Sequence, residues 1–158
     1  MLNLIFAIKF VHVLAAAAMF GTALAVALFM LLADRSGNVS VIAVTARFAV
    51  LVELIVMIPA LALQAISGFP LASAVGLSLG EFWIVLSLLI YALVVASWLA
   101  VLLLEIRIRD MTLEAVLNRK PLPDAYRKIF GLYSALVWPT LAAMIAVFAL
   151  MVWQPRLM

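Results

Sequence analysis

Long runs of apolar residues fill most of this sequence. They cover about residues 4–32, 41–66, 82–106 and 129–153 in a chain of 158 residues, and the helical pattern extends the last two to about 82–117 and 125–153. A helix that crosses a membrane needs about 20 mostly apolar residues, and each run is at least that long. The runs leave no room for a separate soluble domain. The sequence therefore predicts an all-α, polytopic membrane protein whose whole chain, residues 1–158, forms one bundle of four transmembrane helices.

The composition agrees with a membrane protein and excludes several other classes. Hydrophobic residues make up 70% of the chain, against roughly half in soluble domains. Cysteine is absent, which excludes disulfides, thiolate metal sites and thiol redox chemistry. The formal net charge of +3 does not indicate that the protein binds nucleic acid, because the positions of the basic residues relative to a bilayer explain this charge. We expect the lipid bilayer as the partner, and no nucleic acid.

The basic residues are distributed unevenly between the two ends of the predicted bundle. One end carries most of them: Arg35, Arg47, Arg107, Arg109, Arg119, Lys120, Arg127 and Lys128. The opposite end carries only Lys9 and Arg156. Loops rich in Lys and Arg stay on the cytoplasmic side of a membrane. We therefore expect both termini on the outer side, and the basic connection around Arg119 to face anionic lipid.

The alternating directions of the helices give each polar residue a depth in the bundle. The starts of the first and third helices share a level with the ends of the second and fourth. Four polar or sulfur-containing residues at this level are candidates for a cofactor site: Lys9, His12, Gln64 and Met151. A second interpretation of His12, so close to the membrane surface, is that its ring only hydrogen-bonds to a neighbouring side chain. Trp83 and Trp153 fall at the same level, where aromatic rings commonly form a belt at the membrane interface.

The second apolar run contains a polar face. The residues that recur there at intervals of three or four are Glu53, Met57, Ala60, Gln64 and Gly68. Such spacing places them on one side of a helix, and this side should face the bundle interior because lipid cannot satisfy a carboxylate or an amide. Glu53 is the candidate catalytic residue, in a proton relay. Pro59 predicts a kink nearby.

Small residues recur every four positions on the first and third helices. They are Ala17, Gly21 and Ala25 on the first, and Ala92, Ala96 and Ala100 on the third. Small side chains let helices approach closely in a membrane. The pattern predicts close packing within the bundle or in a homodimer.

Several short blocks along nearly the whole chain resemble a known family. They are KFVHV at residues 9–13, PALALQAISG at 59–68, LPDAYRK at 122–128 and MVWQP at 151–155. Together they resemble the bacterial family of four-span integral membrane proteins called domain of unknown function 2269. This resemblance implies a multi-pass protein of the bacterial inner (cytoplasmic) membrane.

The sequence also resembles, more distantly, the HemJ-type protoporphyrinogen oxidases. The likeness lies in the early Lys-x-x-His block, Pro-Ala in the second helix and a last helix that closes on Pro. It implies a bound haem with His12 as the axial ligand, and it adds contact with a porphyrin as the second role open to Glu53. This chain holds a single histidine, so the second ligand would be Met151, water, or His12 of a second chain across a two-fold axis. Lys9 would pair with a haem propionate or extend to the headgroups.

Three classes of function stay open from the sequence. The first is a b-type haem-binding redox protein that acts on a porphyrin or a quinol, as an oxidoreductase related to protoporphyrinogen oxidase. The second is a membrane protein for copper or another small solute, since His and Met suit Cu(I). The third is a structural accessory subunit without a cofactor. The sequence contains no recognisable nucleotide-binding loop, hydrolase elbow, paired-carboxylate site or zinc motif.

Overall fold

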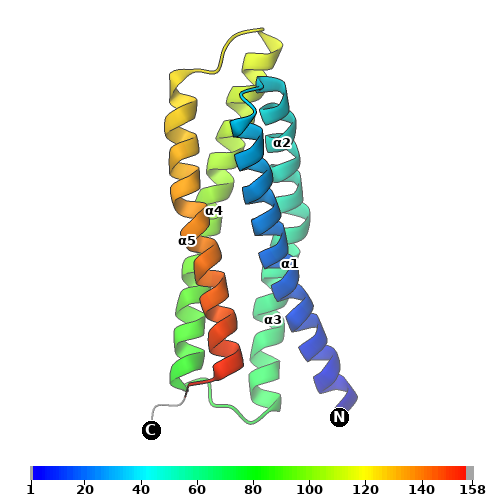
Figure 1. Cartoon of the computed structure of the whole chain (residues 1–158). Helices are drawn as coiled ribbons and strands as arrows, with labels where there is room; N and C mark the ends of the chain where they lie inside the picture. The colour runs from blue at the N-terminus through cyan, green and yellow to red at the C-terminus, as the bar shows by residue number, and fades with distance from the viewer. Residues whose placement is uncertain (1, 156–158) are drawn as a thin grey trace.

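Each apolar run forms one long helical span in the computed structural model, which describes residues 2–155 (Figure 1). The elements are α1 (Leu2–Arg35), α2 (Val39–Val52), the π-helical segment η1 (Glu53–Met57), α3 (Ile58–Ala74), α4 (Phe82–Leu117) and α5 (Asp124–Trp153). Because α2, η1 and α3 follow one another without a break, they form a single rod. All four spans are long and apolar enough to cross a membrane. The predicted all-α bundle of four transmembrane helices is confirmed.

The spans run alternately up and down the bundle, which places the start of α1 and the end of α5 at the same end of the bundle (Figure 1). The α3–α4 connection lies at this end as well, and we call it the terminal end. The opposite end holds the α1–α2 turn and the α4–α5 connection, so we call it the basic end after its Arg and Lys residues. α1 packs against α2 and α3, while α4 packs against α2 and α5. Arg156 lies outside the described residues, and the orientation of the bundle across the membrane stays a prediction.

Local signals define the tight turn between α1 and α2 at the basic end. Gly37 has φ 65°, a left-handed conformation that glycine adopts without strain. The Asn38 side chain then accepts hydrogen bonds from the backbone N–H groups of Ser40 and Val41, which caps α2. The Tyr126 hydroxyl on α5 donates to Asp34 Oδ1 at 2.7 Å. This contact holds the start of α5 against the end of α1.

The second span ends later than the sequence predicts. We expected it to end at Ile66, but the helix continues to Ala74 with Pro70 inside it. Proline removes one backbone hydrogen bond from a helix. Breaking the helix there would instead leave several backbone groups unpaired in an apolar environment, which is more costly. The turn signals at Ser67 and Gly68 are therefore overridden.

The distortion expected near Pro59 takes the form of a π turn. The N–H of Ile58 bonds to the carbonyl of Glu53, five residues back, and η1 ends one residue before Ile58. Proline has no N–H, and in a regular helix its ring would clash with the carbonyl four residues earlier. The wider turn accommodates this ring while the rod remains continuous.

The side chains divide into a lipid-facing set and an interior set. Large apolar residues are exposed on every span, for example Phe10, Ile55, Leu89 and Ile145. The polar face of the second span turns inward, since Glu53, Met57, Ala60 and Gln64 are buried. In contrast, Ala17, Gly21 and Ala92 of the small-residue stripes are exposed. Those positions do not pack the bundle interior, and their use in a homodimer stays a prediction.

Candidate ligand-binding pocket

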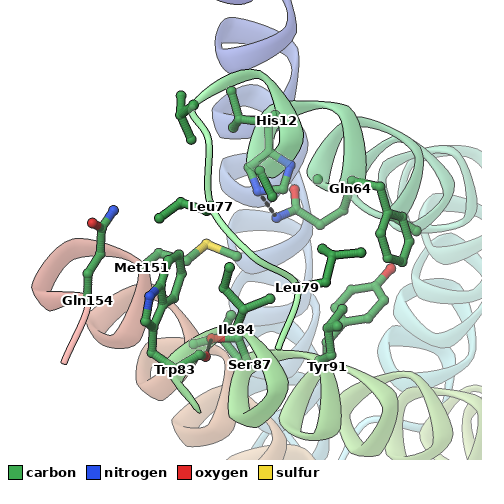
Figure 2. Close-up of a pocket in the computed structure, with 18 of the residues that line it drawn as sticks. His12, Gln64, Leu77, Leu79, Trp83, Ile84, Ser87, Tyr91, Met151 and Gln154 are labelled. Carbon is green, nitrogen blue, oxygen red and sulfur yellow. Dashed lines mark hydrogen bonds between the residues drawn. The ribbon is translucent and has the colours of Figure 1, made fainter. Parts of the chain in front are cut away.

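A cavity of about 580 Å³ lies among the four spans at the terminal end of the bundle (Figure 2). Apolar side chains form most of its wall, including Leu77 and Leu79 from the α3–α4 connection. The polar or charged residues of the wall are Lys9, His12, Gln64, Trp83, Ser87, Tyr91 and Gln154. Pockets that hold small molecules and cofactors are typically about 300–1,000 Å³, with a few polar groups in a mainly apolar wall. The cavity has the size and lining of such a pocket.

His12 lies in the cavity wall, and both of its ring nitrogens have hydrogen-bond partners. Nδ1 is 2.9 Å from Ser67 Oγ, and Nε2 is 3.0 Å from Gln64 Nε2. The Ser67 hydroxyl donates its own hydrogen to the Leu63 carbonyl, so its oxygen accepts from His12 Nδ1–H. The Gln64 amide then donates to the lone pair of Nε2. The imidazole is neutral in this arrangement, and Nε2 is its basic nitrogen.

The local sequence of α3 orients the imidazole and makes room for it. Gln64 and Ser67 are three residues apart, so they project from one side of the helix toward α1. Gly68 comes next, where an added Cβ would lie 3.3 Å from His12 Cε1. The missing side chain at Gly68 lets the ring lie against the α3 backbone. The run of Gln64, Ser67 and Gly68 thus forms the seat of His12.

Two buried polar atoms in the cavity wall have no hydrogen-bond partner among the described residues. They are Gln64 Oε1, an acceptor, and Trp83 Nε1, a donor. Gln64 is 6% exposed and Trp83 is 8% exposed, so both atoms are shielded from bulk solvent. An unpaired buried polar group costs about 1–3 kcal/mol. A ligand with both a donor and an acceptor would satisfy them.

Four of the five candidate site residues come together at this cavity. Lys9 and His12 on α1, Gln64 on α3 and Met151 on α5 all line it. Figure 2 shows the Gln64 amide directed at the His12 ring, with the Met151 sulfur among the side chains drawn around the pocket. This geometry agrees with the shared level expected from the sequence. Their roles as ligands stay predictions.

Glu53, the fifth candidate, lies apart from the cavity. It is on η1, about 16 Å along the rod from Gln64, and it is 2% exposed. Its Oε2 accepts a hydrogen bond from the indole N–H of Trp98. Within the described residues the one ion pair joins Arg109 to Asp110, so no basic side chain neutralises Glu53. Glu53 therefore belongs to a separate polar cluster in the bundle.

Several residues of the pocket were missed from the sequence. Trp83, expected in an interfacial belt, is instead buried in the cavity wall. It faces inward together with Ser87 and Tyr91, which follow at intervals of four, and the Tyr91 hydroxyl donates to the Leu61 carbonyl at 2.8 Å. That helical spacing of polar groups was the available signal. Ser67 was also missed, although it lies one turn after Gln64.

The donors in the wall define the chemistry that the pocket can perform. It offers one neutral imidazole from His12, one thioether from Met151 and one ammonium from Lys9. Across residues 2–155, His, Asp and Glu side chains form no group of three or more that could hold a metal ion. An iron or copper centre at this place would therefore rely on His12 and a neutral second donor.

Comparison with known proteins identifies a family for this chain. Residues 6–155 match the family model described as predicted integral membrane protein (DUF2269). No curated protein and no solved structure matches the chain. The family model covers nearly the whole sequence, and its description agrees with the four spans of the structure, so the chain belongs to the DUF2269 family of predicted integral membrane proteins.

Proposed function

We propose that this integral membrane protein binds a b-type haem in the cavity, with His12 as an axial ligand, and acts as a redox protein on a porphyrin or a quinol. The observation that carries the proposal is the hydrogen bond from His12 Nδ1–H to Ser67. Metal-ligating histidines usually donate their other ring N–H to a fixed acceptor, which orients the ring and increases its basicity. Nε2 of His12 is then the donor atom offered to iron.

Other residues of the wall fit the same group. Met151 offers a thioether, and His/Met pairs are a known form of haem ligation. Lys9 offers an ammonium to a propionate carboxylate. The Gln64 amide now lies on Nε2, so it turns away when a ligand binds there. The turned amide then presents Gln64 Oε1, which now has no partner among the described residues, to a polar edge of the bound group.

The chain's own residues would position the group and control its environment. A bound haem supplies one-electron transfer, which none of these side chains performs. His12 binds iron, Ser67 holds the imidazole tautomer, and the apolar wall excludes water. The axial ligands and the low polarity then set the reduction potential. The resemblance to HemJ-type oxidases supports porphyrin as a substrate class, and the family resemblance supports the bacterial inner membrane as the location.

The direct test is an absorption spectrum of the detergent-purified protein after expression with ample haem. We expect a Soret band in the oxidised protein that shifts when dithionite is added. A featureless spectrum from correctly folded protein would reject haem binding. Metal analysis of the same sample would then test the copper alternative, which the His12 and Met151 donors suit.

Met151→Leu tests the second axial ligand. Because methionine ligation raises the haem reduction potential, we expect the variant to keep its haem but to show a lower potential and an altered reduced spectrum. Met144→Leu is the matched control, since Met144 is a buried methionine on the same helix that does not line the cavity. A Met151→Leu spectrum and potential that match those of the wild type would exclude Met151 as a ligand.

A further inference from the structure

A second polar cluster lies inside the bundle, outside the wall of the cavity. It consists of Glu53 on η1, Trp98 and Glu105 on α4, and Tyr133 on α5. Glu105 is 0% exposed, Tyr133 is 1% exposed and Glu53 is 2% exposed. Glu53 lies about 20 Å along the rod from its first residue, Val39. These groups are therefore deep within the membrane-spanning part of the chain.

The two carboxylates of this cluster have different partners. Glu53 accepts a hydrogen bond from the Trp98 indole. In contrast, neither Oε1 nor Oε2 of Glu105 has a hydrogen-bond partner among the described residues, and the Tyr133 hydroxyl has none either. Tyr133 nevertheless lies beside Glu105 and within electrostatic reach of Glu53. An unpaired hydroxyl therefore lies beside an unpaired carboxylate in the interior of the bundle.

The two carboxylates have no basic partner in an ion pair within the part of the chain that the structure describes. Glu53 and Glu105 lie within electrostatic reach of each other. The rod and α5 both pack against α4, and the titratable groups that they place next to Glu105 are Glu53 and Tyr133. Within residues 2–155 no Lys or Arg forms an ion pair with either carboxylate. Two negative charges cannot both persist in such an interior, since each one is costly alone and they repel each other.

We propose that Glu105 binds a proton inside the bundle, with Glu53 as its ionised partner and Tyr133 as the hydroxyl that links them. The Trp98 donor stabilises the ionised form of Glu53, whereas the one hydroxyl beside Glu105, that of Tyr133, makes no regular hydrogen bond to it among residues 2–155. The proton adds to one oxygen of the Glu105 carboxylate and leaves from the same atom, and no other bond changes. Glu53 opens a π turn, an element that frequently occurs at functional sites. This proton site does not depend on haem in the cavity.

Infrared spectroscopy of the protein in lipid tests this assignment. A protonated carboxylic acid has a carbonyl stretching band that is separate from the bands of carboxylates and shifts in D₂O. At neutral pH we expect this band in the wild type, its loss in Glu105→Gln, and its retention in Glu53→Gln. Glu114→Gln is the matched control, because Glu114 is an exposed glutamate on the same helix. It should leave the band unchanged.

A second variant keeps the proposal testable even if Glu105→Gln does not fold. Tyr133→Phe keeps the ring and removes only the hydroxyl, so it should shift the band without removing it. Absence of the band in the wild type, its survival in Glu105→Gln, or its loss in Glu53→Gln instead would overturn the proposal. Loss of the band when Na⁺ replaces choline at constant pH and ionic strength would also overturn it, in favour of a metal cation.

Discussion

The His12→Ala variant is expected to fold and to lose the haem absorption bands completely. The chain has one histidine, so no second imidazole can take the place of the missing ligand. Loss of a residue that only supports a metal ligand weakens binding about 10–100-fold, and loss of the ligand itself should exceed that. The bundle should survive, because the Ser67 hydroxyl keeps its bond to the Leu63 carbonyl when the imidazole is gone. The readout is the Soret absorbance per unit of protein.

Ser67→Ala separates the orientation of His12 from its ligation. This variant keeps the imidazole but removes the acceptor of Nδ1–H, so we expect haem affinity to fall about 10–100-fold rather than vanish. Circular dichroism and gel filtration should match those of the wild type in both variants. Full haem bands in His12→Ala would exclude His12 as the ligand. Equal losses in His12→Ala and Ser67→Ala would mean that the seat is structural and that ligation lies elsewhere.

The four spans could be predicted from the sequence because each apolar run is longer than a bilayer requires. The ends were harder to predict. α4 was predicted to end at residue 117 and ends at Leu117, since a cluster of polar residues and prolines follows it. The second span was predicted too short because Gly68 and Pro70 are typical stop signals for a helix. In water they commonly end a helix, but inside a membrane the unpaired backbone groups of a broken helix are worse than one missing bond.

The candidate pocket could be predicted only in part, because depth is readable from the sequence and helix rotation is not. Depth alone grouped His12, Gln64 and Met151, and all three line the cavity. The rotation of α4 decides that Trp83 faces inward rather than toward lipid. Glu105 was missed for a related reason. It lies two residues before Arg107 in the sequence and therefore looks like part of the charged end of the span, although its side chain turns into the core.

Glu105→Leu is expected to stabilise the protein, which is the reverse of what most core substitutions do. The Glu105 carboxyl group is fully buried, and neither of its oxygens has a hydrogen-bond partner among residues 2–155. Such an unsatisfied group costs about 1–3 kcal/mol. Leucine has a similar volume, carries no polar atom, and its neighbours on the same side of α4, Val101 and Ile108, are apolar and buried. We therefore expect the free energy of unfolding in detergent to rise by about 1–3 kcal/mol.

Ile108→Ala shows whether the unfolding measurement senses this part of the core. Ile108 is 0% exposed, and truncating such a residue should lower the free energy of unfolding by about 2–5 kcal/mol. If Glu105→Leu were destabilising by a similar amount, the carboxyl group would have partners in the folded protein, and its contribution to stability alone would explain its presence in the core. A stabilising effect has the opposite meaning. It would mean that Glu105 weakens the fold at the centre of the bundle and that its role is to hold a proton. Glu105→Leu should then both raise the free energy of unfolding and remove the carboxylic acid band.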